Sequence, residues 1–196
     1  MKTPADNANP VPDCLEILYF YYPEDTPLRR LLLRHSAQVR DKALALVPDG
    51  EKELVASCCM LHDIGIGECH APDILCTGTK PYLAHGLAGG AMIREYGRRH
   101  QLDLECFARV CERHTGTGIT EEEIRRKKLP LPEQDWLPET RVEKLVCYAD
   151  KFFSKSGSMR EKSLEHIRAG LAKFGPDTLA RFEELHRLFG RQTCNT

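Results

Sequence analysis

The chain has 196 residues, of which 41% are hydrophobic and 29% are charged, and this balance predicts a globular protein rather than a disordered one. Its formal net charge of −1 gives no reason to expect nucleic acid or an anionic membrane as a partner. No run of about 18 apolar residues is present and the N-terminal stretch is polar, so we expect neither a transmembrane span nor a secretory signal, and a loose tail at the N-terminus.

The first two predicted elements are helices. The apolar run 15–22 fits a helix or a strand, and we favour a helix because no other part of the chain shows a strand pattern. The second helix is predicted from Pro27 to Val47, where apolar residues recur at helical spacing. His35 lies within that apolar stripe and not on the charged side of the helix.

A third helix is predicted over 51–63, and it places His62 and Asp63 side by side in its last turn. Gly65 and Gly67 follow, and glycine after the last periodic residue is a stop signal. An imidazole and a carboxylate next to apolar residues are costly to bury without a partner. A metal ion that accepts one nitrogen and one oxygen ligand would explain the pair.

Residues 64–80 are predicted to form a loop, and Pro81 is expected to open the next helix, which carries His85. Its run of glycines is poor for helix stability but allows another segment to approach the backbone closely. A further helix ends near His114, which continues an apolar face.

The rest of the chain is also expected to be helical. Thr120 and Glu123 form a predicted capping box for a short helix over 120–128. The proline-rich loop 129–139 precedes a helix in which Asp150 lies at the edge of the apolar face. Two helices, about 160–174 and 177–189, close an all-α bundle that we assign to one domain, 1–196.

Most of the nine cysteines are expected to be free thiols in a reducing cytosol, which predicts a cytoplasmic protein. Five lie within apolar helical patterns and are expected to be buried, whereas two flank the loop 64–80 and are expected to be accessible. The first five are Cys58, Cys59, Cys106, Cys111 and Cys147, and the other two are Cys69 and Cys76.

Four histidines and two aspartates lie on or beside apolar helix faces. A single histidine in such a position is usually a core residue whose hydrogen bonds are satisfied, but aspartate is rarely buried without a partner. The remaining histidines, His70, His100, His166 and His186, fall on polar stretches and are expected at the surface. The six candidates are His35, His62, Asp63, His85, His114 and Asp150.

The order His, His-Asp, His, His, Asp, with HDIG at 62–65, resembles the HD-domain superfamily of metal-dependent phosphohydrolases. The resemblance covers roughly residues 28–155, and the helices about 160–190 would pack on that core. It implies that His35, His62, Asp63 and Asp150 bind one metal ion. It also implies that His85 and His114 complete a second ion bridged by Asp63. Mixed imidazole and carboxylate ligands suit iron, manganese, zinc or nickel.

The resemblance implies hydrolysis of a phosphate ester or phosphoanhydride by a metal-activated water, with His62 and Asp63 as the catalytic pair. The partner would be a small phosphorylated molecule, with nucleotides among the candidates. Lys80 and Arg113, which precede His85 and His114 closely, are predicted to contact the phosphate. Lys151 and Lys155 are further candidates.

Two departures and two alternatives qualify this hypothesis. Ile66 stands where relatives that hydrolyse cyclic dinucleotides carry a lysine, and GTGIT replaces their GYP motif, which argues against that substrate. An HD-type diiron oxygenase would use the same ligand order, and a non-catalytic metal-binding regulatory module would retain it. Trp136 is expected to stack on a base or to pack in the core. The pattern specifies neither the metal, the substrate nor the oligomeric state.

Overall fold

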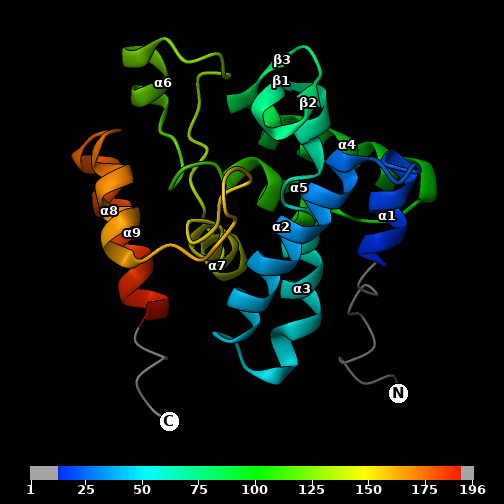
Figure 1. Cartoon of the computed structure of the whole chain (residues 1–196), viewed down its shortest axis with the longest axis horizontal. Helices are drawn as coiled ribbons and strands as arrows, with labels where there is room; N and C mark the ends of the chain where they lie inside the picture. Colours follow the sequence, from blue (N-terminus) through cyan, green and yellow to red (C-terminus); the bar gives the residue numbers. More distant parts are fainter. Residues whose placement is uncertain (1–12, 191–196) are drawn as a thin grey trace, which may run out of the picture.

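The computed structural model describes residues 13–190, and helices dominate this part of the chain (Figure 1). The all-helical prediction is confirmed, including a helix over the ambiguous run 15–22, while the predicted N-terminal tail lies outside the described residues. No helix among residues 13–190 is long and apolar enough to cross a bilayer. The helices described are α1 Cys14–Tyr21, α2 Pro27–Leu44, α3 Lys52–Leu61, α4 His85–His100, α5 Glu105–Arg113, α6 Glu121–Lys127, α7 Arg141–Asp150, α8 Leu164–Ala172 and α9 Pro176–Phe189.

Side-chain caps fix the starts of several helices. The Thr26 hydroxyl caps α2, which ends at Leu44, three residues before the predicted end. The predicted capping box at the start of α6 is present: the Thr120 hydroxyl accepts from the backbone N–H of Glu123, whose carboxylate accepts from the Thr120 N–H. Thr140 and Glu143 form a second box at α7. Because a cap satisfies N–H groups that have no helical partner, these residues set where each helix begins.

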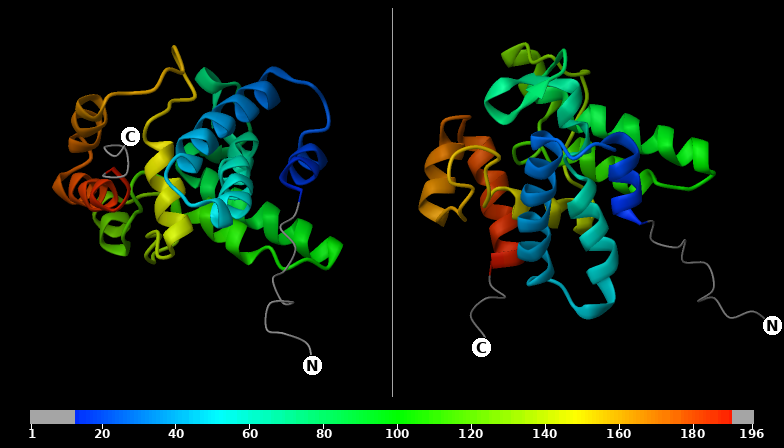
Figure 2. Two further views of the ribbon diagram at one scale, coloured as in Figure 1. Left: turned by 90° about the horizontal axis from the view of Figure 1, so that it is seen from below. Right: turned by 45° about the vertical axis from the view of Figure 1, so that its right-hand side comes forward.

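The central core lies between α2, α3, α5 and α7, and α4 runs along α5 (Figures 1 and 2). The helices face each other with aliphatic side chains that exclude water almost completely. Burial of this apolar surface drives the assembly of the bundle. Representative core residues are Val39, Leu61, Val110, Leu145 and Val146.

Residues 64–84 differ from the predicted loop because they contain a small sheet with strand order β2-β1-β3. β1 pairs antiparallel with β2 and parallel with β3. Strands of two or three residues are too short for an alternating pattern, which is why periodicity did not reveal them. The elements are the 3-10 turns η3 Ile64–Glu68, η4 Pro72–Ile74 and η5 Tyr82–Ala84 and the strands β1 Cys69–Ala71, β2 Cys76–Thr77 and β3 Lys80–Pro81.

The cysteine predictions were partly wrong. Cys69 and Cys76 are fully buried, because the small sheet packs them against neighbouring residues instead of leaving them in an open loop. Cys106, in contrast, is exposed on the outer side of α5. The other four predicted core cysteines are buried: Cys58, Cys59, Cys111 and Cys147.

The C-terminal helices pack on the core through α9. The Tyr148 hydroxyl on α7 lies 2.8 Å from Nδ1 of His186, which is therefore half-buried rather than at the surface as predicted. Arg181 on α9 forms a mostly buried ion pair with Glu123 of α6 at 2.8 Å. These contacts tie α9 to the segment that follows His114.

Candidate metal centre

His62 and Asp63 follow directly after α3, which ends two residues before the predicted end at residue 63. The helix ends at Leu61, His62 is its C-cap, and Asp63 leads into the 3-10 turn η3. Both side chains are fully buried. A Cβ atom at Gly65 would overlap the backbone of α4 at His85 and Gly89. Glycine is therefore needed here because it lets α4 approach the His-Asp pair closely.

His35 and Asp150 approach this pair from α2 and α7. Nε2 of His35 lies 3.0 Å from Oδ1 of Asp150 and 3.2 Å from Oδ2 of Asp63. Nε2 of His62 lies 3.3 Å from Oδ2 of Asp63 and 3.6 Å from Oδ1 of Asp150. The ligand atoms of these four side chains lie within 4.8 Å of one another. We call them the first ligand group.

His85 and His114 face the other oxygen of Asp63. His85 is the first residue of α4, and His114 is the C-cap of α5. Their Nε2 atoms lie 3.4 Å and 3.3 Å from Oδ1 of Asp63 and 3.1 Å from each other. Together with Asp63 they form the second ligand group. The Asp63 carboxylate therefore belongs to both groups, with one oxygen in each.

Backbone carbonyls orient three of the four imidazoles. Nδ1 of His62 lies 2.6 Å from the Cys59 carbonyl, and Nδ1 of His85 and of His114 lie 2.7 Å from the carbonyls of Tyr82 and Cys111. A carbonyl can only accept, so each Nδ1 carries a proton, and in the neutral imidazole Nε2 presents its lone pair to the centre. The signal for this arrangement is visible in the sequence, since each partner stands three residues before its histidine.

The donor pattern fits a metal ion better than a purely hydrogen-bonded cluster. The Nε2 lone pairs of His85 and His114 face each other at 3.1 Å with no proton between them. Nε2 of His62 is buried without a hydrogen-bond partner, and Oδ1 of Asp63 faces only the Nε2 atoms of His85 and His114. Buried acceptors are destabilising unless a donor or a cation satisfies them. Nitrogen and oxygen ligands of this kind are compatible with a divalent transition metal.

The charge states of the second group also suit a metal. Burial lowers the pKa of His85 to about 3 and lowers that of His114, so both imidazoles are neutral near neutral pH. Burial alone would raise the pKa of Asp63, but Lys155 and His62 hold it well below its usual range. Metal ligands must be neutral imidazoles and ionised carboxylates, and these three residues are already in that state.

His62 differs, because burial lowers its pKa but the Asp63 and Asp150 carboxylates outweigh that effect and raise it to about 9. Without a metal ion, this imidazole therefore carries a positive charge that partly neutralises the two aspartates. A metal ion in the first group would replace that proton, so proton release should accompany metal binding.

Two lysines contact the aspartates of the centre, whereas Lys80 and Arg113, the cations predicted to contact phosphate, form ion pairs with other residues. Nζ of Lys155 lies 2.7 Å from Oδ2 of Asp63, and Nζ of Lys151 lies 2.8 Å from Oδ2 of Asp150. Lys80 pairs instead with Glu68 at 3.1 Å in an exposed position.

Arg113 is also directed away from the six candidate ligands. It donates to the Leu137 carbonyl at 2.6 Å and pairs with Glu139 at 2.8 Å. The phosphate role of Lys80 and Arg113 stays a prediction, as do the ligand roles of the six residues. The geometry favours Lys151 and Lys155 as the positive groups next to the centre.

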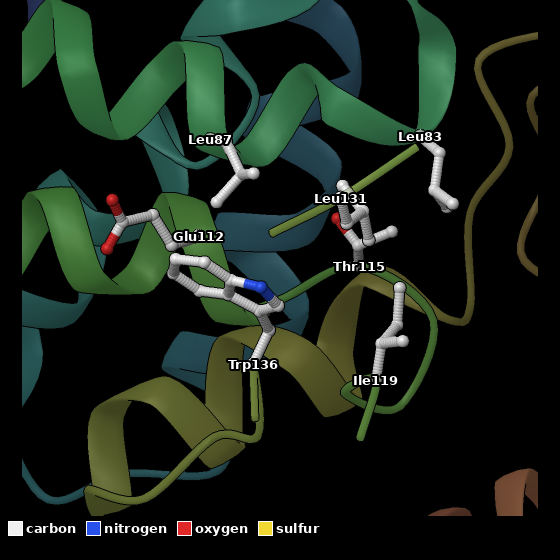
Figure 3. Close-up of a pocket in the computed structure, with 7 residues that line it drawn as sticks. All are labelled: Leu83, Leu87, Glu112, Thr115, Ile119, Leu131 and Trp136. Carbon is white, nitrogen blue, oxygen red and sulfur yellow. The ribbon is translucent and has the colours of Figure 1, made fainter. Parts of the chain in front are cut away.

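Trp136 lines a small crevice close to His114 (Figure 3). The indole lies beside Glu112 and Leu87, and its Nε1–H donates to the Pro132 carbonyl at 3.2 Å. The volume of about 10 Å³ is of the size of one water molecule. Of the two predicted roles for Trp136, the crevice supports packing, because it leaves no space for a base.

Sequence comparisons place the centre within a matched region. Residues 32–154 match the model of the HD domain. A tRNA (cytidine(56)-2'-O)-methyltransferase of Picrophilus torridus is 33% identical over 159 residues, which is 79% of this chain and 40% of that protein. The protein of the same name from Thermoplasma volcanium is 30% identical over 183 residues, which is 90% of this chain and 46% of that protein.

An uncharacterized protein of Methanocaldococcus jannaschii is 38% identical over 111 residues, or 55% of each chain. This chain therefore spans about half the length of the curated relatives it matches. No solved structure matches the chain.

Proposed function

This chain belongs to the HD-domain family, and on that premise we propose that it is a metal-dependent phosphohydrolase. Its substrate would be a phosphate ester or phosphoanhydride of a small molecule, with nucleotides among the candidates. The observation that carries the proposal is the Asp63 carboxylate, which directs one oxygen to each of two ligand groups. Two adjacent ligand groups on one carboxylate match what hydrolysis assisted by two metal ions requires.

In this proposal the first group, His35, His62, Asp63 and Asp150, holds one ion, and Asp63 with His85 and His114 holds the other. When bound, divalent ions lower the pKa of a coordinated water and polarise a phosphoryl oxygen. The chain itself supplies orientation, because backbone carbonyls keep three imidazoles in one tautomer.

The chain also supplies positive charge next to the ions. Lys151 and Lys155 are largely buried, with side chains only 11% exposed, and their ammonium groups contact the aspartates. Ammonium groups in a site with little water stabilise negative charge more strongly than they do at the surface. We propose that both lysines bind phosphoryl oxygens once metal ions satisfy the two carboxylates.

We assign the methyltransferase activity named for two relatives to the part of those proteins that this chain does not match. The match leaves more than half of each relative uncovered. The matched helices of this chain instead contain the histidine-aspartate cluster. The tRNA in those names therefore describes the relatives, and for this chain we propose a small phosphorylated substrate.

A metal-dependent activity screen tests the proposal. Metal-free protein would be loaded separately with iron, manganese, zinc and nickel and assayed for phosphate release from monoesters, diesters and phosphoanhydrides, with and without oxygen. We expect release with at least one metal, unchanged without oxygen, abolished in Asp63→Asn and retained in the exposed control Asp73→Asn. Turnover that requires oxygen would favour the oxygenase alternative. Metal binding without any turnover would favour the non-catalytic module.

A further inference from the structure

A second cavity shares Asp150 with the metal centre. It has a volume of about 250 Å³ and lies between the end of α7 and helix α8. One member of the first ligand group therefore forms part of its wall. The segment 151–163, drawn in yellow to orange, connects the two helices that bound it (Figure 2). The other residues relevant here are Lys151, Phe153, Lys162, His166 and Phe174.

The cavity contains an ammonium group that has no carboxylate partner. Nζ of Lys162 donates to the backbone carbonyl of Lys151 at 3.0 Å, and within residues 13–190 no aspartate or glutamate forms an ion pair with it. The residue is half-buried, and burial lowers the pKa of its ammonium group. Lys151 and Lys155, in contrast, each contact a carboxylate of the centre.

The positive charge around the centre favours binding of a ligand with more than one anionic group. Asp63 and Asp150 neutralise at most half of the charge of two divalent ions. Lys151 and Lys162 add positive charge in the cavity, and among the described residues Asp150 is the one acid in its lining. A single phosphate at the ions would leave Lys162 unmatched, because an unpaired charge with little access to water is costly.

We propose that this cavity binds the second phosphate of a phosphoanhydride, with Lys162 as its contact. The inference rests on the proposed function and narrows its substrate class from phosphate compounds in general to linked phosphates. One phosphate would lie at the metal ions near Lys151 and Lys155, and the next would lie in the cavity at Lys162. His166, at the exposed rim, would add a further hydrogen-bond donor.

The lining of the cavity also contains apolar side chains, which suit the organic part of such a substrate. Phe153 and Leu171 line the cavity, and Phe174, which is 65% exposed, stands at its edge. A large aromatic side chain is rarely so exposed without a reason, and its flat face can take a ring by stacking. The cavity thus places charge next to the metal centre and apolar surface beyond it.

Calorimetric binding of two stable probes tests the inference. Methylenediphosphonate has two linked phosphonate groups, and methylphosphonate has one. Both would be titrated into metal-loaded protein, with metal content measured before and after. Lys162→Met should weaken methylenediphosphonate binding about tenfold to a hundredfold and leave methylphosphonate binding unchanged. Lys162→Arg should recover most of the loss, and Lys173→Met, at the exposed end of α8, should change neither probe.

The outcomes separate a phosphate contact from a structural role and from failure of the proposed function. Equal weakening of both probes, or no weakening of either, would overturn the inference. If Lys162→Met does not fold, Lys162→Arg takes its place in the test. The inference would then be overturned if Lys162→Arg did not prefer methylenediphosphonate over methylphosphonate as wild type does. Probe binding does not depend on turnover, so a selective loss of methylenediphosphonate binding in Lys162→Met would support the inference even if no substrate were hydrolysed. Phosphate release by a protein that shows no such selectivity would support the proposed hydrolase function but not this inference.

Discussion

Replacing His85 with alanine should remove one metal ion and keep the other. His85 belongs only to the second ligand group, where it is one of three ligands, whereas all four members of the first group remain. Two protein ligands hold a transition metal much less tightly than three. Metal analysis of wild type should therefore give two ions per chain, and the variant should give one.

The loss should also appear in thermal unfolding. An ion present at a hundred times its dissociation constant stabilises the native state by about 2.7 kcal/mol. For a domain of this size, that corresponds to a decrease in Tm of roughly 5–10 °C for the metal-loaded variant. The metal-free variant should differ little from metal-free wild type. The substitution leaves a cavity that destabilises the variant, but it also removes the repulsion between the Nε2 lone pairs of His85 and His114, which lie 3.1 Å apart. These two effects on the free energy of unfolding oppose each other.

Inductively coupled plasma mass spectrometry and differential scanning calorimetry measure these two effects. His70→Ala is the matched control, because His70 is exposed on β1 and belongs to neither ligand group. It should keep both ions and the full Tm. Two ions retained in His85→Ala, or none bound by wild type at saturating metal, would refute the assignment of a second site.

Three further outcomes follow from buried ion pairs. Lys155→Met removes the ammonium group that lies 2.7 Å from the Asp63 carboxylate, so it should destabilise the metal-free protein by about 3 kcal/mol. The metal-loaded protein should lose less, and urea unfolding with and without metal measures both effects. Arg181→Met should cost about 2 kcal/mol in the same assay, because it removes the 2.8 Å guanidinium partner of the buried Glu123 carboxylate and leaves only the Thr120 N–H and Lys127 at 4.0 Å. Burial raises the pKa of Glu123, but the Thr120 backbone N–H and Arg181 outweigh it and lower it below 4.5. A carboxyl group whose pKa is lower in the folded state stabilises the protein at pH values above its unfolded pKa, and this contribution is lost as the group is protonated in acid. The free energy of unfolding should therefore decrease below about pH 4.5, and it should decrease less steeply in Arg181→Met.

The helices could be predicted from the sequence because their signals are local. Apolar spacing, capping residues and proline or glycine at the ends identify each helix without knowledge of its neighbours. The sheet formed by residues 69–81 could not be found this way. Its strands of two or three residues are defined by their pairing with one another and not by any pattern within a single strand. Burial of Cys69 and Cys76 depends on the same pairing and was missed for the same reason.

The clustering of the six candidate ligands could be predicted from the sequence, whereas the positions of Lys80 and Arg113 could not. The candidate ligands lie on buried helix faces, so packing of the helices brings them together. Lys80 is close to His85 in sequence, but pairing of β3 with β1 leaves it exposed beside Glu68. Adjacent residues on a helix point roughly 100° apart, and Arg113 accordingly points away from the centre that His114 faces. The segment 151–163 brings Lys162 into one cavity with Asp150, and no local pattern encodes the path of that segment.

Two of the histidines show how helix ends can prepare a metal site. The last carbonyls of a helix lack N–H partners, and His62 and His114, as C-caps, donate Nδ1–H to the carbonyls three residues earlier. One hydrogen bond thus satisfies the carbonyl and fixes the imidazole tautomer. His35 lies within α2, its Nδ1 has no partner in the described chain, and its Nε2 faces two carboxylates at 3.0 Å and 3.2 Å. Its Nε2–H therefore donates a hydrogen bond to these carboxylates, and a metal ion bound through Nε2 would have to displace that hydrogen.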